Sequence, residues 1–278
     1  MGAVTWTAIL GTGGGSRRLK QGVATPGGRT AVDNSSMFKQ IGYFHFATGH
    51  YDPIGSLESA WADDPGLPGS LLVLPEAFNL GRHYGEGGKP AIHRDEMIAD
   101  LMALATTWNS SFVVGILEPT RPIERPLSSA YFVTANGHWL MCHKELPDFV
   151  GDYIPCTAPD DHNPIILEDT SILTMICVDI RNSARSSRLA QKAHRQGKHH
   201  NLVCIPAAMS DSSWFGGARC GSDIGFLKSN YEENAYVILA NSDSRGLGSF
   251  VTGSDWTVRE CVESVAKERN QLKLMTLL

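Results

Sequence analysis

The stretch from Thr170 to Arg181 constrains the fold of this chain more than any other. Its part Ser171–Cys177 is almost entirely apolar or small and predicts a buried strand that ends on a cysteine. A thiol placed there is held by the sheet behind it and faces the cleft in front, and the backbone N–H of Val178 is left to point at a bound oxygen. These are the needs of a nucleophile with an oxyanion site beside it. Because free cysteines are among the most buried residue types, this stretch alone favours a core cysteine.

Strands alternate with helices along the rest of the chain, and one hairpin interrupts the series. The Asn136-Gly137 pair is a strong hairpin signal. Apolar runs predict strands at 41–47, 69–74, 111–117, 128–134, 138–142, 165–167, 171–177, 201–206, 236–240 and 248–252, and helical spacing predicts helices at 53–62, 93–108, 183–196 and 224–235. The tail 256–278 fits a helix or strands. This order argues for an α/β fold with a mixed sheet and helices outside it.

Composition excludes several classes of protein. The 278 residues carry a formal net charge of −5 and the pI is about 6.0. The chain therefore lacks the excess of positive charge that is typical of proteins that bind nucleic acid. No apolar run approaches the length that spans a bilayer. Six scattered cysteines show neither pairing motifs nor zinc-ligand spacing. We therefore expect a reduced, cytoplasmic protein with no metal site.

The first 40 residues differ from the rest of the chain. They are glycine-rich and have no sustained hydrophobic period, and they lack the full pattern of a phosphate-binding loop. We expect residues 1–40 to form a mobile segment and residues 41–278 to form one domain.

Two further stretches hold candidate catalytic residues. In the segment 74–78 (Leu-Pro-Glu-Ala-Phe), Glu76 stands just past a strand whose apolar run is unbroken, so its carboxylate is expected to be partly desolvated. Lys144 directly follows the predicted hairpin. Taken singly, Glu76 also suits a solvated loop or a helix cap, and Lys144 suits a solvated loop.

Together, the three stretches resemble the nitrilase, or carbon–nitrogen hydrolase, superfamily. That family has a Glu after a strand, a Lys after a hairpin and a Cys after a buried strand, in this order and at similar separations; the resemblance covers about residues 41–255. It implies a four-layer α-β-β-α sandwich that needs no cofactor. It also implies that Cys177 is the nucleophile and Glu76 the general base, and that Lys144 and the N–H of Val178 stabilise the oxyanion.

Within the superfamily, the chain is most similar to the hydrolase-like domain of apolipoprotein N-acyltransferases. The segment 151–155 (Gly-Asp-Tyr-Ile-Pro) follows the register of that branch and places Asp152 where the family has a second Glu, which implies that Asp152 orients Lys144 or the substrate. Asp152 reaches about 1.5 Å less far than a Glu. Trp214 and Phe215 resemble an aromatic pair in a loop of that branch, and either line a substrate cleft or anchor the loop. The membrane helices of the acyltransferase are absent.

The leading hypothesis is hydrolysis of a non-peptide carbon–nitrogen bond in a small amide, nitrile or ureido compound, through a cysteine thioester. In an alternative, an amine replaces water and the reaction is acyl transfer. A third hypothesis is a non-catalytic nitrilase-like binding or scaffold protein, against which the intact Glu-Lys-Cys set argues. The resemblance further implies a homodimer, with the helix 183–196 as a candidate interface. Neither nucleic acid nor a membrane is expected as a partner.

Overall fold

The computed structural model describes thirteen stretches of the chain, which lie in one compact unit, 32–278. These stretches are 38–46, 52–83, 92–118, 127–145, 163–167, 170–181, 188, 191, 200–208, 235–242, 249–255, 258–261 and 270–277. Most of the two predicted helices 183–196 and 224–235 lies outside the described residues, as do residues 1–37 of the predicted amino-terminal segment. The last residues of that segment belong to the folded unit, because Phe38 is buried in its core and Gln40 begins its first strand.

The first sheet has six strands in the order β12-β1-β2-β3-β4-β5. Their bounds are Gln271–Thr276 (β12), Gln40–His45 (β1), Ser70–Val73 (β2), Ser111–Glu118 (β3), Leu127–Thr134 (β4) and Gly137–His143 (β5). β1, β2 and β3 run parallel, whereas β12 and the predicted hairpin β4–β5 pair antiparallel. The parallel strands therefore bring their carboxyl ends to the same edge of the sheet.

The second sheet also has six strands, in the order β11-β10-β9-β8-β7-β6. Their bounds are Val258–Cys261 (β11), Phe250–Thr252 (β10), Ala235–Asn241 (β9), His200–Ala207 (β8), Thr170–Thr174 (β7) and Ile165–Ile166 (β6). β7, β8 and β9 are parallel, as their near-continuous apolar runs indicate. The ambiguous tail contributes strands to both sheets, β11 to this one and β12 to the first.

The two sheets pack face to face around a shared apolar core. Alternate residues of each strand point into this core, because successive side chains of a strand face opposite sides. On β8, Leu202 and Cys204 join the core between the sheets, while Val203 and Ile205 form part of a separate buried cluster on the outer side. Both faces of the second sheet are thus buried.

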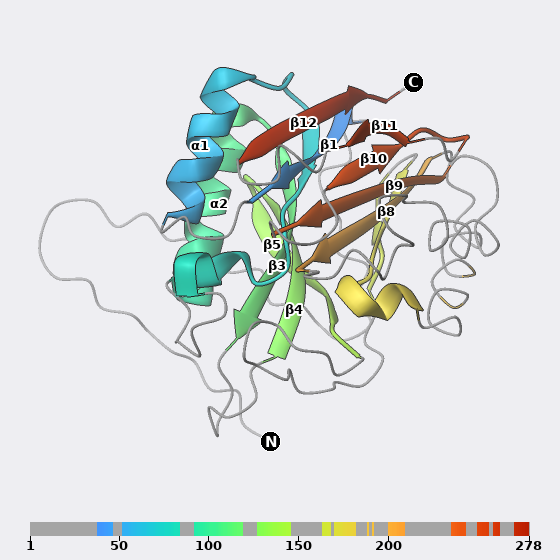
Figure 1. Ribbon diagram of the computed structural model, residues 1–278. Coiled ribbons are helices and arrows are strands. Elements are labelled where there is room, and N and C mark those ends of the chain that lie inside the picture. Colours follow the sequence, from blue (N-terminus) through green and yellow to red (C-terminus); the bar gives the residue numbers. More distant parts are fainter. Residues whose placement is uncertain are drawn as a thin grey trace, which may run out of the picture. The chain divides into compact units, whose positions relative to one another are not determined.

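Two helices cover the outer face of the first sheet (Figure 1). α1 (Pro53–Asp63) begins after Asp52, whose carboxylate accepts the backbone N–H of Gly55 at 2.9 Å and so caps the helix. α2 (Arg94–Trp108) presents Met97, Leu101 and Leu104 to the sheet. The fold is an α/β sandwich of the α-β-β-α type, as predicted.

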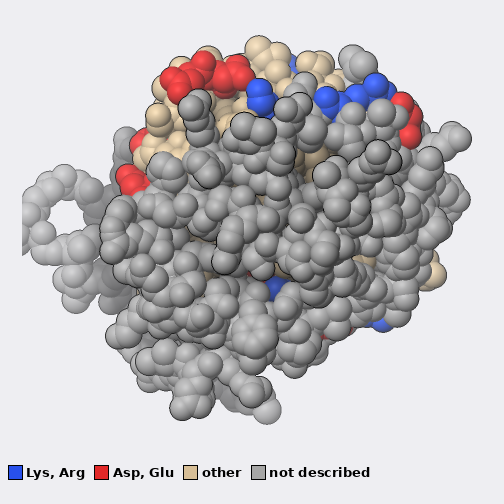
Figure 2. All heavy atoms as spheres, in the orientation of Figure 1, with Lys and Arg blue, Asp and Glu red and all other residues tan. Residues whose placement is uncertain are grey.

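The described surface carries both signs of charge. On the face drawn in Figure 2, acidic and basic side chains both lie along the upper rim. Within the described stretches, neither α1 nor α2 combines the length and hydropathy that crossing a bilayer requires.

The strand before the cysteine is shorter than predicted. β7 ends at Thr174, and the cysteine itself begins a 3₁₀ helix, η2 (Cys177–Arg181). The residues between them still follow β8, because the N–H of Met175 donates to the carbonyl of Cys204 at 3.2 Å. The extended backbone is then broken at Cys177, where φ is 50°. The prediction that the strand continues to residue 177 is therefore wrong.

Gly115 on β3 lies close to the turn after β2 and to Pro206 of the second sheet. A Cβ at this position would lie 2.6 Å from Glu76 Cα, 3.0 Å from Pro75 O and 3.1 Å from Pro206 Cβ. Gly115 also donates its N–H to Pro75 O at 3.2 Å. Because glycine has no side chain, the turn that carries Glu76 can lie directly against β3.

We expect Gly115→Ala to lower the free energy of unfolding by about 1–3 kcal/mol, because the added methyl group overpacks a backbone contact that cannot yield. Gly137→Ala is the matched control: its new Cβ would meet its nearest atom, in the Trp139 ring, at 3.5 Å. Urea denaturation of both variants measures the difference. Equal stability of the two variants would contradict the close-packing interpretation.

Candidate active site

Glu76 is held at the carboxyl end of β2, between the two sheets. The N–H of Leu74 donates to Val113 O of the neighbouring strand at 2.7 Å, and the N–H of Glu76 itself donates to Ala207 O, at the end of β8, at 3.2 Å. Ala77 follows with a left-handed φ of 55°, which turns the chain into the 3₁₀ helix η1 (Phe78–His83). The turn therefore fixes Glu76 to strand ends of both sheets.

The Glu76 carboxylate forms a buried ion pair with Lys144. Lys144 Nζ lies 3.0 Å from Glu76 Oε1, and neither side chain has any exposed surface. Ser128 Oγ, from the start of β4, donates to the same oxygen at 2.8 Å. The second carboxylate oxygen, Oε2, is buried and accepts no hydrogen bond from the part of the chain that the structure describes.

Lys144 is positioned by backbone contacts at the end of β5. Its N–H donates to Ser128 O at 2.7 Å, and the next N–H, that of Glu145, donates to both carboxylate oxygens of Asp179 at 3.2 and 3.0 Å. Burial alone would lower the pKa of Lys144, but the interactions with Cys177 in its thiolate form and with the Glu76 and Asp179 carboxylates outweigh it and raise that pKa above its usual range. Lys144 is therefore an ammonium ion in spite of its burial.

Cys177 is the first residue of η2 and has a left-handed backbone conformation that residues other than glycine rarely adopt. It is 3% exposed. Burial raises the pKa of the thiol, the Lys144 charge lowers it, the Glu76 carboxylate raises it, and a hydrogen bond from the Ala208 backbone lowers it, with a net value of about 12. The resting sulfur is thus a protonated thiol at neutral pH and needs a base to become a nucleophile.

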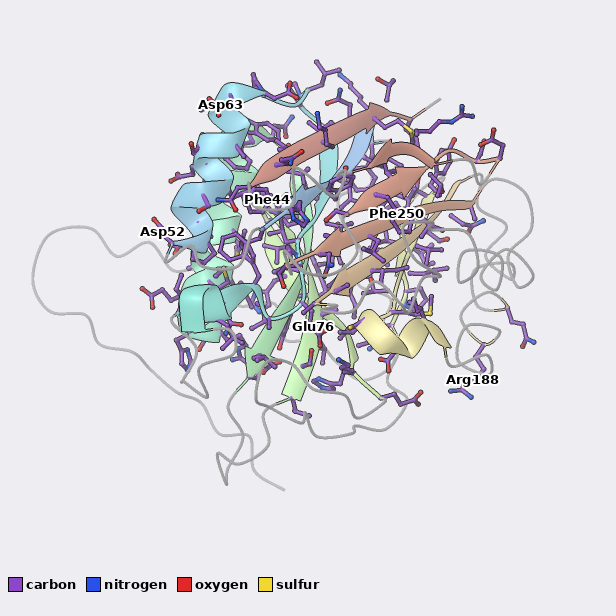
Figure 3. All side chains as sticks on the ribbon, in the orientation of Figure 1. Phe44, Asp52, Asp63, Glu76, Arg188 and Phe250 are labelled. Atoms are coloured by element: carbon purple, nitrogen blue, oxygen red, sulfur yellow. The ribbon has the colours of Figure 1, made fainter. Side chains whose placement is uncertain are left out.

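The three side chains predicted to be catalytic thus meet at one place. Figure 3 shows Glu76 beside the beginning of η2, in agreement with the electrostatic coupling of Cys177 to both Glu76 and Lys144. A thiol, an unoccupied carboxylate oxygen and an ammonium group can perform a nucleophilic attack, a proton transfer and the stabilisation of a developing negative charge.

Of the other predicted site residues, the structure describes only the backbone of one. The backbone of Val178 lies in η2, directly after the cysteine. Asp152, Trp214 and Phe215 lie outside the described residues. No cluster of three or more His, Cys, Asp or Glu side chains suited to a metal ion occurs in the described stretches.

Two buried polar residues of the site carry no role in the sequence-based prediction. Ser128 bonds the Glu76 carboxylate, and Asp179 bonds the backbone after Lys144. Asp179 could have been identified from the sequence, because it lies only two residues after the candidate nucleophile. Ser128 has only a weak signal: it is a polar residue near the start of a strand that precedes the lysine.

Comparison with solved structures supports the fold. A variant of the Nesterenkonia sp. AN1 amidase, from the nitrilase superfamily, has a TM-score of 0.63 and 15% identity over 86% of this chain and 91% of that chain. Another variant of that amidase, which shows Michael addition of acrylamide at the active-site cysteine, has a TM-score of 0.61 and 16% identity over 86% and 93%. Saccharomyces cerevisiae Nit3, from branch 10 of the superfamily, has a TM-score of 0.59 and 17% identity over 86% and 90%.

The sequence comparisons give no further assignment. No protein-family model matches the chain, and no curated protein matches it. At identities of 15–17%, the solved structures show a shared fold. This chain has the fold of nitrilase-superfamily amidases.

We expect Lys144→Met to cost on the order of 3–5 kcal/mol of unfolding free energy at neutral pH, because it leaves the Glu76 charge buried without a counter-ion. Urea denaturation at neutral pH measures the loss.

The matched control is Arg259→Met. Arg259 pairs with Asp255 at 2.7 Å, but the two side chains are 50% and 52% exposed, so the loss is expected to stay below about 1 kcal/mol. Equal losses in the two variants would contradict a desolvated Glu76–Lys144 pair.

Proposed function

We propose that this protein hydrolyses the carbon–nitrogen bond of a small amide through a thioester on Cys177. The observation that carries the proposal is the buried Glu76–Lys144 pair, which is coupled to a protonated thiol at the carboxyl ends of the strands. The fold, shared with amidases of the nitrilase superfamily, supports the same chemistry. Nitriles and ureido compounds belong to the wider substrate class that the sequence resemblance implies.

In the first half of the reaction, Cys177 Sγ attacks the carbonyl carbon of the amide while its proton moves to Glu76. Oε2 is the oxygen that suits this transfer, because Oε1 already accepts two hydrogen bonds. The carbonyl oxygen becomes an oxyanion, which the Lys144 ammonium and the N–H of Val178 stabilise. Glu76 then returns the proton to the leaving nitrogen, the carbon–nitrogen bond breaks, and ammonia or an amine departs.

In the second half, water attacks the thioester carbon. Glu76 takes one proton of this water, a second oxyanion forms against Lys144, and the carbon–sulfur bond breaks. The sulfur recovers a proton and the product leaves as an acid. We assign Asp152 to the orientation of Lys144 or the substrate, and Trp214 and Phe215 to the wall of the substrate cleft.

A panel of small aliphatic and aromatic amides, with nitriles and ureido compounds beside them, tests the proposal by ammonia release. Intact-mass spectrometry of protein treated with iodoacetamide tests the nucleophile. An amine such as hydroxylamine added to the assay reports acyl transfer, because it competes with water for the thioester. Absence of ammonia release from the whole panel, together with an unlabelled Cys177, would refute the proposal.

We expect Cys177→Ala to abolish both turnover and labelling, since the attacking atom is gone, and Cys177→Ser to be nearly as inactive, since a hydroxyl is far less acidic. Glu76→Gln is expected to abolish turnover because both half-reactions need the base. Lys144→Ala is expected to lose about 10²–10³-fold in rate or more, the scale of a lost oxyanion donor. Asp152→Asn is expected to cost least of these positions.

Single-turnover kinetics on any active amide measure this ranking. Cys204→Ala is the control, because Cys204 is also a free and fully buried cysteine but lies in the core between the sheets. Wild-type turnover by Cys177→Ala would overturn the nucleophile assignment.

Two-fold self-association and a cytoplasmic location also stay predictions. Pairing as a dimer is the commonest closed symmetry, and light scattering at micromolar concentration measures it.

A further inference from the structure

The two oxygens of the Glu76 carboxylate have different surroundings. Oε1 accepts hydrogen bonds from Lys144 Nζ at 3.0 Å and from Ser128 Oγ at 2.8 Å. Oε2 is buried and accepts none from the described part of the chain. All three side chains are essentially inaccessible to water, since Ser128 and Glu76 are 0% exposed and Lys144 is 1% exposed.

Ser128 contacts both members of the ion pair. Its hydroxyl donates to the Glu76 carboxylate, and its carbonyl oxygen accepts the backbone N–H of Lys144 at 2.7 Å. The residue itself is fixed at the start of β4 by antiparallel pairing, opposite Leu117 of β3. One rigid strand residue therefore sets the position of the base and that of the lysine backbone.

A glutamate carboxylate without such contacts turns easily, because rotation about its last side-chain bond has a broad energy profile. Lys144 alone does not fix the plane of the carboxylate, since an ammonium group is a compact charge with rotatable donors. A second donor on the same oxygen restricts this rotation. The pair of donors thus keeps Oε1 occupied and Oε2 available.

We propose that Ser128 is a positioning residue that, together with Lys144, holds Glu76 Oε1 and so assigns Oε2 as the oxygen that exchanges a proton with the Cys177 thiol. This inference rests on the proposed function, in which Glu76 is the base. Ser128 itself touches neither the sulfur nor the substrate in this scheme.

Ser128→Ala is expected to slow labelling of Cys177 by iodoacetamide, and turnover of any active amide, by about 10-fold or more, the scale of a lost hydrogen bond to a charged group. The loss in turnover is expected in kcat rather than in KM, because Ser128 does not touch the substrate. Ser128→Thr, which keeps the hydroxyl, is expected to restore both rates.

The matched control is Ser129→Ala, one residue further along β4. Ser129 is also 0% exposed, and its hydroxyl bonds a different partner, His143 Nδ1, at 2.7 Å. This variant loses a buried hydroxyl and one hydrogen bond but leaves the Glu76 contacts in place. We therefore expect its labelling rate and its kcat to match those of the wild type, whatever its thermal stability.

The outcomes separate the two levels of the proposal. If wild-type Cys177 reacts and Ser128→Ala shows the same labelling rate and kcat as the wild type, the role of Ser128 is refuted while the proposed function stands. If Ser128→Ala and Ser129→Ala are slowed equally, Ser128 is only a packing residue and the inference also falls. If wild-type Cys177 neither reacts nor supports turnover, both the function and the inference fall. Should Ser128→Ala fail to fold, Ser128→Cys fills the site with a slightly larger and weaker donor and is expected to show the same loss of rate.

Discussion

The buried ion pair between Glu76 and Lys144 is the interaction on which the rest of this site depends. Moving a carboxylate and an ammonium group out of water costs several kcal/mol for each ion, and their attraction offsets this only with good geometry and additional hydrogen bonds. The 3.0 Å separation and the Ser128 hydroxyl supply that geometry on the carboxylate side. Replacement of a buried ion pair by apolar residues of similar volume is often neutral or stabilising. Stability alone therefore does not account for this pair, whereas the proposed chemistry does.

Backbone contacts between strand ends keep the pair in place. The N–H of Glu76 bonds the end of β8 in the opposite sheet, and Gly115 admits the Glu76 turn against β3 because it has no side chain. Asp179 extends the same principle to the third candidate, Cys177, since it lies in η2 after the cysteine and accepts the backbone N–H that follows Lys144. Backbone contacts thus connect η2 with the end of β5, and they connect the Glu76 turn with both sheets.

Much of this arrangement could be predicted from the sequence, because strong periodic signals and three ordered motifs placed Glu76, Lys144 and Cys177 just past strands or a hairpin. The end of β7 could not, since Met175 and Ile176 are as apolar as the strand before them, and only the left-handed conformation of Cys177 ends the extended backbone. The tail 256–278 was ambiguous because its strands β11 and β12 join two different sheets, and this depends on long-range pairing. Ser128 escaped prediction for a similar reason: a serine at the start of a strand is common, and its value comes from a carboxylate 52 residues earlier in the chain.

The protonation state of the sulfur determines at which point of the proposed reaction Cys177 becomes a nucleophile. A thiol whose pKa is about 12 is not a standing nucleophile, so it resists alkylation and oxidation better than a thiolate would. The thiol interacts with the Glu76 carboxylate, whose Oε2 accepts no hydrogen bond from the described residues. Loss of the proton to this oxygen becomes favourable when a substrate carbonyl offers a place for the negative charge beside Lys144. In this interpretation the ion pair does not activate the cysteine in advance; it makes activation conditional on the substrate.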